Sequence, residues 1–361
     1  MEKYRVGIVG ATGMVGQRFI SLLKDHPWFE VNCVAASARS AGKTYREAVG
    51  ERWAFAWEIP EKVAGMTVVD AADIDEVSKH VDFVFCAVDM KKDEIRALEE
   101  AYAKHEIPVV SNNSACRGIE DVPMVVPEIN ADHLAVIEAQ KKRLGTKNGF
   151  IAVKPNCSIQ SYVPALTPLL DFEPKKVSVC TYQAISGAGK TFKTWPEMVD
   201  NVIPYIGGED EKSENEPLKL WGHVEDGKIV NAALPVISAQ CLRVACSDGH
   251  MAAVSVSFKK KPTIEQIKER WANYETEAQR LELPSAPKPF LQYFEDPSRP
   301  QTRLDRDFQN GFGVSIGRLR EDKLFDYRFV CLSHNTVRGA AGGGILTAEL
   351  LCRKGYIPHR V

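Results

Sequence analysis

The stretch GIVGATGMVGQ, residues 7–17, joins a short apolar run to a segment whose apolar residues cover one face of a helix. Its glycines follow the expected strand and open the expected helix. In such a turn, backbone N–H groups and the helix dipole face an anion, and the missing side chains permit its close approach. The turn is predicted to bind a dinucleotide phosphate through Gly10, Thr12, Gly13, Met14, Val15 and Gly16, the alternative being a tight turn without a ligand.

The segments after this turn alternate between strand and helix patterns. Apolar runs predict strands at residues 30–37, 81–88 and 107–114, and an amphipathic pattern predicts a helix at 93–105. Strands separated by helices are typical of a parallel sheet, so we expect a doubly wound, Rossmann-like α/β domain.

The pattern changes after about residue 157. Residues 175–186 and 250–260 alternate strongly, and residues 326–335 read as another strand, which predicts an antiparallel sheet covered by helices in a second, α+β domain. The acidic stretch 207–217 is expected to be a polar loop. The apolar helix near the C-terminus is expected to pack on the first domain, giving domains of residues 1–156 plus 338–361 and of 157–337.

Composition excludes several classes of protein. The 361 residues carry a net charge of −2, which gives no electrostatic reason to expect a nucleic acid or an anionic membrane as partner. The longest apolar stretches have the length of strands, and the start reads as a strand rather than a signal peptide, so a cytoplasmic location is expected. The nine cysteines form no C-x-x-C pair, so neither a metal site nor a disulfide framework is predicted.

The end of the second expected strand bears on the choice of cofactor. An acidic residue there would bind the ribose of NAD and repel a 2′-phosphate. The sequence AASARSAGK, residues 35–43, has no acid and instead offers Ser37, Arg39 and Ser40. Hydroxyl groups and a guanidinium suit a phosphate, so NADP is predicted, with a solvated basic loop as the alternative.

Cys157 in VKPNCSIQS, residues 153–161, is the candidate nucleophile. A position in the first turn of the following helix would lower the pKa of its thiol, because the helix dipole stabilises an anion. The side chain of Asn156 or nearby N–H groups could donate to an oxyanion. These residues alone leave a buried structural cysteine equally possible.

A cysteine nucleophile needs a base, and the chain has eight histidines. Those of the first domain, His26, His80, His105 and His133, are expected to face solvent. His250 follows the turn SDG and leads into an alternating strand, which fixes it at a sheet end, so it is the candidate base. A structural histidine is the alternative.

Seven motifs together carry a resemblance across nearly the whole chain: GATGMVG, SARSAGK, SNNSACR, DVPMVVPEIN, KPNCSIQ, TYQAISGAGK and HNTVRGAAGG. Their order and spacing resemble the aspartate-β-semialdehyde dehydrogenase family, in its archaeal and fungal branch. The resemblance implies NADPH-dependent reductive dephosphorylation of L-4-aspartyl phosphate to L-aspartate 4-semialdehyde. This step leads toward lysine (through diaminopimelate), threonine, methionine and isoleucine.

The resemblance also implies residue roles. Cys157 forms a thioester, His250 acts as general acid and base, and Gln183 orients the substrate. Arg117 binds phosphate and Arg243 binds the substrate carboxylate. The family's Glu-x-x-Lys pair matches Glu209 with Lys212, which we prefer, or Glu216 with Lys219. Ser186, Gly187 and Asn335 approach the nicotinamide, and Cys86 either passes near the cofactor or is a core thiol.

The family implies a homodimer or homotetramer formed through the second domain, and inorganic phosphate as a small-molecule partner. A malonyl-CoA-type acyl-CoA reductase resembles this branch and is the nearest alternative enzyme. N-acetylglutamyl-phosphate reductase fits less well, because SNNSACR and TYQAISGAGK look unlike it. A nucleotide-binding protein without turnover is the alternative from another class.

Overall fold

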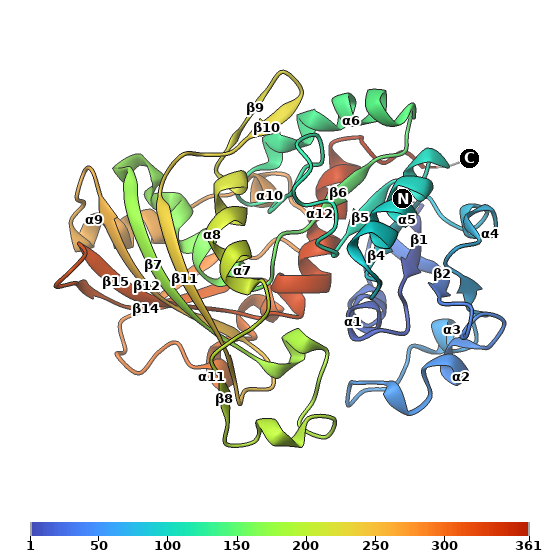
Figure 1. The fold of residues 1–361 in the computed structure, drawn as a ribbon, viewed down its shortest axis with the longest axis horizontal. Coiled ribbons are helices and arrows are strands. Elements are labelled where there is room, and N and C mark those ends of the chain that lie inside the picture. Colours follow the sequence, from blue (N-terminus) through green and yellow to red (C-terminus); the bar gives the residue numbers. More distant parts are fainter. Residues whose placement is uncertain (1, 360–361) are drawn as a thin grey trace.

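The computed structural model describes residues 2–359 and contains a parallel sheet of six strands (Figure 1). The strands are β1 (Tyr4–Val9), β2 (Phe29–Ala36), β3 (Val69–Asp70), β4 (Phe83–Cys86), β5 (Val109–Ser111) and β6 (Ile151–Val153), in the order β3-β2-β1-β4-β5-β6. The order reverses between β1 and β4, and sheets of this kind bind ligands at that point, outside the carboxyl ends of the strands. The predicted doubly wound sheet is confirmed.

The glycine turn lies at this reversal, between β1 and α1 (Met14–Leu23). Gly10 has a φ of +90°, and a Cβ there would lie 2.2 Å from the carbonyl oxygen of Ala87. A Cβ at Gly16 would lie 2.3 Å from the carbonyl oxygen of Gly10. Both positions therefore require glycine for the helix to start this close to the sheet.

A second sheet has seven strands in the order β13-β14-β15-β12-β7-β11-β8. Its strands are β7 (Pro174–Gln183), β8 (Val202–Ile203), β11 (Val236–Val244), β12 (His250–Phe258), β13 (Leu291–Phe294), β14 (Val314–Glu321) and β15 (Tyr327–Ser333). The expectation of an antiparallel sheet is wrong for two pairs, because β7 runs parallel to β11 and β13 runs parallel to β14. The sheet is mixed.

Helices α7 (Ile159–Leu166) and α8 (Glu209–Leu220) lie between the sheets, as Figure 1 shows. Helix α8 packs along β11, while α7 contacts β12, β14 and β15. The remaining helices and the short hairpin are α2 (Tyr45–Val49), α3 (Glu61–Ala64), α4 (Ile74–Ser78), α5 (Lys92–Lys104), α6 (Ile137–Leu144), α9 (Ile264–Ala272), α10 (Glu277–Arg280), α11 (Thr302–Asp305), α12 (Gly342–Arg353), β9 (His223–Glu225) and β10 (Lys228–Val230).

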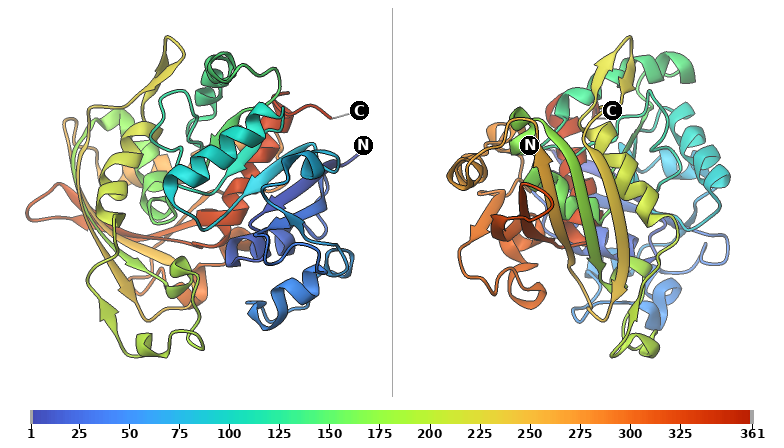
Figure 2. Two further views of the ribbon diagram at one scale, coloured as in Figure 1. Left: turned by 45° about the vertical axis from the view of Figure 1, so that its right-hand side comes forward. Right: turned by 60° about the vertical axis from the view of Figure 1, so that its left-hand side comes forward.

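The last helix, α12, returns to the first sheet, as expected. It contacts β5 and α1, and Ile345, Leu346 and Leu350 share an apolar core with the buried residues of β1 and β2. The rings of Tyr4 and His359 stack with centroids 3.8 Å apart, so the two ends of the described chain meet (Figure 2).

Two expectations are wrong. The acidic stretch 207–217 is not a loop, because most of it belongs to α8. The buried positions of this helix include Glu209, Ser213 and Lys219, so its inner face is largely polar and its helical period in hydrophobicity is weak. His26 and His133 are buried rather than solvent-facing, and His26 contacts the buried carboxylate of Glu349 at 2.8 Å.

Arg338 and Glu128 form a buried ion pair that connects the start of the C-terminal segment to the loop before α6. Both guanidinium nitrogens Nη1 and Nη2 donate to the carboxylate at 2.7 Å, and the side chains are 2% and 0% exposed. Removing one partner of such a pair leaves the other charge buried and uncompensated.

Replacement of Arg338 by Met is expected to lower the free energy of unfolding by about 3–5 kcal/mol, because Glu128 is left buried and unpaired. Urea denaturation measures this loss. The double variant Glu128→Leu/Arg338→Met should lose less than either single variant. Arg46→Met, which breaks the exposed pair with Glu61, should change the unfolding free energy by less than about 1 kcal/mol. Equal effects of Arg338→Met and Arg46→Met would contradict the prediction.

Candidate active site

Cys157 and His250 meet between the two sheets. The sulfur Sγ of Cys157 lies 3.4 Å from Nε2 of His250, although the two residues are far apart in the sequence. Cys157 follows β6 and precedes α7, and His250 is the first residue of β12. The structure therefore brings the predicted nucleophile and the predicted base into hydrogen-bonding contact.

The orientation of His250 is set by a backbone group. The N–H of Ala184 donates to Nδ1 at 3.1 Å, so Nδ1 is an acceptor. Burial lowers the pKa of His250 to about 3, and the charge of Arg243 adds to this shift. The ring is therefore neutral at neutral pH, and its single proton is on Nε2, facing the sulfur.

The environment of the thiol differs from the prediction. α7 begins at Ile159 with Ser158 as N-cap, so Cys157 lies before the first turn of the helix. Burial raises the pKa of the Cys157 thiol, and the carboxylate of Glu209 adds to the shift. The expected lowering by the helix dipole is thus wrong. Three cations oppose the shift, namely Lys154, Arg243 and Arg117.

The C-terminal segment closes one side of the nucleophile. A Cβ on Gly339 would lie 2.9 Å from the Cβ of Cys157, so any other residue at this position would displace the thiol or the segment itself. Gly339 was not predicted as a site residue. Its only sequence signal was its place in the motif HNTVRGAAGG.

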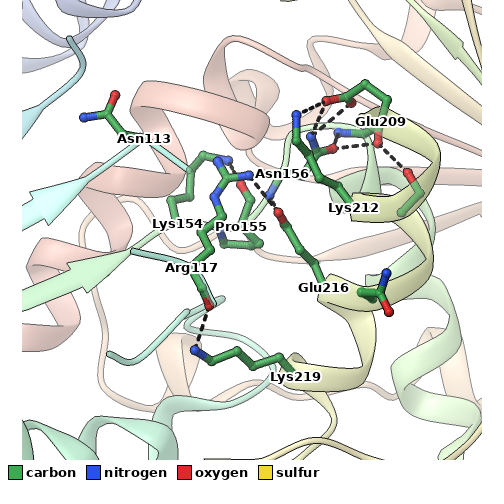
Figure 3. A network of polar contacts seen from close by, with 12 residues as sticks. Asn113, Arg117, Lys154, Pro155, Asn156, Glu209, Lys212, Glu216 and Lys219 are labelled. Atoms are coloured by element: carbon green, nitrogen blue, oxygen red, sulfur yellow. Dashed lines mark hydrogen bonds and ion pairs between the residues drawn. The ribbon is translucent and has the colours of Figure 1, made fainter. Parts of the chain in front are cut away.

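Helix α8 presents two acids to the site (Figure 3). Glu209 accepts hydrogen bonds from Nδ2 of Asn156 at 3.0 Å and from Nε2 of Gln183 at 3.2 Å, and it pairs with Lys212 at 2.8 Å. Burial pushes the pKa of Glu209 upward, but the hydrogen bonds from Lys212, Asn156 and Gln183 outweigh it and leave the pKa below its usual value. Glu209 is therefore a buried anion about one helical turn from Lys212.

Glu216 lies about two helical turns beyond Glu209, on the same face of α8. Its carboxylate accepts from Nη1 of Arg117 at 2.9 Å and from the backbone N–H of Asn156 at 2.5 Å. Lys219 donates from Nζ to three carbonyl oxygens of the loop that carries Arg117, those of Arg117, Ile119 and Val122. Glu216 and Lys219 thus hold the loop and side chain of Arg117, whereas Glu209 and Lys212 adjoin Asn156 and Gln183.

The two predicted anion-binding arginines come from different parts of the fold, Arg117 from the loop after β5 and Arg243 from β11. Arg117 donates from Nη2 to the carbonyl of Asn112 at 3.1 Å, and its buried Nε has no hydrogen-bond partner among residues 2–359. Arg243 on β11 lies opposite Gln183 in the register of β11 with β7. Its Nη1 donates to the carbonyl of Ala184 at 2.7 Å. Both guanidinium groups are held in place with donor capacity remaining.

The side chain of Asn156 has another task than the one predicted. Its Nδ2 is bound by Glu209, and its Oδ1 accepts from the backbone N–H of Ser158 at 2.8 Å and from the Ser158 hydroxyl at 2.6 Å. With both ends of the amide engaged, Asn156 fixes the loop of the nucleophile rather than offering a donor to an oxyanion.

Residues predicted near the nicotinamide also cluster. Nδ2 of Asn335 donates to the Ser186 hydroxyl at 2.8 Å, and its Oδ1 accepts from the N–H of Gly249, the residue before His250. A Cβ on Gly187 would lie 3.0 Å from Nε2 of His250, so this glycine leaves space beside the imidazole. The thiol of Cys86 is buried in the core and accepts from Nδ2 of Asn113 at 3.3 Å.

The glycine turn has room for an anion. Gly13 is exposed at the N-cap of α1, and a Cβ there would meet only the carbonyl oxygen of Gly10, at 3.5 Å. Protein packing therefore does not require glycine at this position, and the cap has no side-chain hydrogen bond. Ser37 and Arg39 are exposed just beyond β2, and the N–H of the buried Ser40 donates to the carbonyl of Ser37 at 2.8 Å. These groups fit the phosphates of NADP.

One charged residue next to the nucleophile was not predicted. Lys154 directly follows the apolar strand β6 and is 3% exposed. Its Nζ donates to the carbonyl oxygen of Pro155. Burial, together with the nearby charge of Arg117, lowers the pKa of Lys154 to about 7. A lysine that follows a buried strand and precedes a candidate nucleophile was the available signal.

Family models match both parts of the chain. Residues 5–137 match the model of the semialdehyde dehydrogenase NAD binding domain, and residues 166–338 match that of the semialdehyde dehydrogenase dimerisation domain.

Similar proteins extend over the full length. The aspartate-semialdehyde dehydrogenase of Archaeoglobus fulgidus is 43% identical over 98% of this chain and 100% of its own. That of Schizosaccharomyces pombe is 45% identical over 98% and 99%. The crystal structure of aspartate semialdehyde dehydrogenase with NADP from Candida albicans superposes with a TM-score of 0.89, at 39% identity, covering 99% of this chain and 100% of that one.

Alkylation of Cys157 by iodoacetamide is expected to accelerate with pH through a midpoint above about 8.5, the ordinary value of a cysteine thiol. The reason is that burial and Glu209 favour the neutral thiol, so the thiolate forms only at higher pH. Mass spectrometry of the Cys157 peptide measures the rate. A plateau reached below pH 8 would contradict the raised pKa.

Proposed function

The chain belongs to the aspartate-semialdehyde dehydrogenase family, and from that premise we propose that it interconverts L-4-aspartyl phosphate and L-aspartate 4-semialdehyde through a thioester on Cys157. The family makes it an NADP-dependent oxidoreductase. The observation that carries the proposed mechanism is the contact of 3.4 Å between the sulfur of Cys157 and Nε2 of His250.

In the first step, Cys157 reacts as the thiolate, and its sulfur attacks the acyl carbon of aspartyl phosphate. The carbon–sulfur bond forms, the bond between the acyl carbon and the phosphate oxygen breaks, and inorganic phosphate leaves. Arg117 is proposed to hold the phosphate, because its Nε is a buried donor without a partner in the described chain. Its planar fork is suited to an oxyanion.

In the second step, the thioester is reduced and released. NADPH, when bound, supplies the hydride for the acyl carbon. Reduction leaves an oxyanion on the former acyl carbon, and His250, as general acid, shares its Nε2 proton with this oxyanion through a hydrogen bond. As the carbonyl re-forms, the carbon–sulfur bond breaks, the proton stays on His250, and the aldehyde and the Cys157 thiolate are released. The N–H of Ala184 keeps the ring in the tautomer that donation requires.

Substrate recognition is assigned to charges around this pair. Arg243 is proposed to bind the substrate carboxylate and Glu209 the substrate amine, with Gln183 orienting the substrate between them. The pair Glu209 and Lys212 is preferred over Glu216 and Lys219, because its carboxylate binds Asn156 and Gln183 beside the nucleophile. An ammonium next to Glu209 would also offset the charge that raises the pKa of Cys157.

Cofactor binding is assigned to the glycine turn and to the end of β2. Gly10, Thr12, Gly13, Met14, Val15 and Gly16 are proposed to surround the pyrophosphate, and Ser37, Arg39 and Ser40 the 2′-phosphate. Ser186, Gly187 and Asn335 are proposed on the nicotinamide side. Cys86 is proposed to contact the cofactor only through its backbone, because its thiol is buried.

We divide the chain into a cofactor domain, residues 1–156 plus 338–361, and a catalytic and dimerisation domain, residues 157–337. The return of α12 to the first sheet supports this division. A homodimer, or a homotetramer built from it, is proposed through the second domain. Val236, Tyr182 and Val202 are exposed on β11, β7 and β8, and the match to a dimerisation-domain model points the same way.

The location is proposed to be the cytoplasm, where the substrates of amino-acid biosynthesis occur. In residues 2–359, no helix has the length and apolar character needed to cross a bilayer.

None of the relatives described above is named as an acyl-CoA reductase, as N-acetylglutamyl-phosphate reductase or as a protein without turnover. Two arginines and a buried acid around the thiol also suit a small substrate with two anionic groups and an amine better than a CoA thioester.

The purified protein is expected to reduce NADP when it receives L-aspartate 4-semialdehyde and inorganic phosphate, and not when it receives malonate semialdehyde and CoA. Absorbance at the NADPH band measures both reactions. Cys157→Ala should reduce the first reaction to background, because no thioester can form, while NADP binding stays unchanged. Turnover with only the second pair of substrates, or full activity of Cys157→Ala, would overturn the proposal.

Replacement of Arg39 by Leu is expected to weaken NADP binding by about 10- to 100-fold, because one charged contact with the 2′-phosphate is lost. NAD binding should change by less than about twofold, since NAD lacks that phosphate. Isothermal titration with both cofactors measures the two affinities. Arg46→Leu removes another exposed arginine of the same domain and should leave NADP binding unchanged. Equal losses for NADP and NAD would contradict the assignment.

A further inference from the structure

Helix α5 carries an acid on its buried, otherwise apolar face. The buried residues of this helix are Ile95, Glu99, Tyr102 and Ala103. Glu99 is 0% exposed, so water does not solvate its carboxyl group. A buried carboxyl group is costly unless hydrogen-bond donors or cations take the place of water. The donors that bind Glu99 therefore indicate what this residue does.

Those donors open the loop that carries Arg117. Oε1 of Glu99 accepts from the hydroxyl of Ser111 at 2.5 Å and from Nδ2 of Asn113 at 2.9 Å. The Ser111 hydroxyl in turn accepts from the backbone N–H of Asn113 at 3.0 Å. Burial raises the pKa of Glu99, and the hydrogen bonds from Ser111 and Asn113 oppose that shift. One carboxyl group thus fixes the first residues of the loop.

Asn112 lies between the two residues that bind Glu99, and its backbone connects the first sheet to Arg117. Its N–H donates to the carbonyl of Cys86, at the end of β4, at 2.9 Å. Its carbonyl accepts from Nη2 of Arg117 at 3.1 Å. A shift of either neighbour would therefore move the acceptor that orients the guanidinium. Figure 3 shows the amide of Asn113 well apart from that guanidinium, so Asn113 acts on it through the backbone.

Helix α8 holds the other end of the same loop. Lys219 donates to three carbonyl oxygens, the first of them that of Arg117, and Glu216 accepts from Nη1 of Arg117. Helix α5 contacts β5 and β6 of the first sheet, whereas α8 contacts β11 of the second. The guanidinium is thus held by one acid from each sheet, by Glu99 through the loop and by Glu216 directly.

We propose that Glu99 is a positioning residue for phosphate: through Ser111 and Asn113 it fixes the loop that presents Arg117 to the phosphate group. Glu99 touches no substrate itself, because it is fully buried. Its place on an apolar helix face is explained by this task, since an apolar side chain there would leave the Ser111 hydroxyl and the Asn113 amide without their acceptor. The inference rests on the proposed function in taking Arg117 as the residue that binds phosphate.

The kinetic test compares two Michaelis constants in the full-length protein. Glu99→Leu should raise KM for phosphate about 10-fold or more, because the two hydrogen bonds that fix the loop are lost. KM for L-aspartate 4-semialdehyde should change by less than about threefold, since its charged groups are assigned to Arg243 and Glu209. Glu99→Gln keeps an oxygen acceptor and should leave both constants within about threefold of the original values. Equal rises of both constants in Glu99→Leu, or equal effects of Gln and Leu, would overturn the proposal.

A milder variant and a matched control complete this comparison. Ser111 is 0% exposed and cannot reach phosphate, so Ser111→Ala tests the network without touching a ligand. It should raise KM for phosphate about 3- to 10-fold. Glu349→Leu removes another fully buried glutamate, whose partners are His26 and Ser285, and should leave KM for phosphate in place. A rise in Glu349→Leu as large as that in Glu99→Leu would contradict a specific role of Glu99.

Hydrogen exchange reads the loop without substrate. Glu99→Leu should speed exchange of the backbone amides in residues 111–119 about 10-fold or more, because the start of the loop opens more often. Glu349→Leu should leave exchange of these amides unchanged. Unmoved exchange in a folded Glu99→Leu protein would overturn the proposal. Because exchange needs neither phosphate nor turnover, it tests the hold on the loop even if the original protein fails the substrate assay, so the two failures are distinguishable.

Discussion

A thiol removed from water ionises only where hydrogen-bond donors and positive charge replace the solvent. In this chain the donor is Nε2 of His250, and the direction of that donor is set by the N–H of Ala184 on the far side of the ring. The rest of the site is arranged around this requirement. Arginines flank the sulfur, and the acids of the site are held by partners of their own.

Helix α8 links the loop of Arg117 to the loop of Cys157. One face of the helix holds Asn156 through Glu209 and Glu216 and holds the Arg117 loop through Glu216 and Lys219. The loop of Arg117 follows a strand of the first sheet, whereas α8 packs on the second. A displacement of α8 would therefore move Arg117, which we propose to bind phosphate, and the loop of Cys157 together.

Much of this arrangement could be predicted from the sequence, and the failures have a common cause. The glycine turn, several strands of each sheet and the candidates Cys157 and His250 follow from local patterns or from a family resemblance. Helix α8 was missed because its buried face is polar, and hydrophobic periodicity detects only apolar faces. The direction of the Cys157 pKa shift was wrong because it depends on burial and on Glu209, neither of which is a neighbour in sequence. Lys154 was missed because a lysine beside a strand ordinarily indicates a solvated end.

Helix α12, near the C-terminus, packs on the sheet that contains the N-terminal strand β1. Because Ile345, Leu346 and Leu350 fill the same apolar core as β1 and β2, the early strands cannot complete their burial while the ribosome is still adding the second sheet. The nascent chain must hold an exposed apolar surface until α12 emerges. A stop codon just before α12 would thus damage the part of the protein translated first.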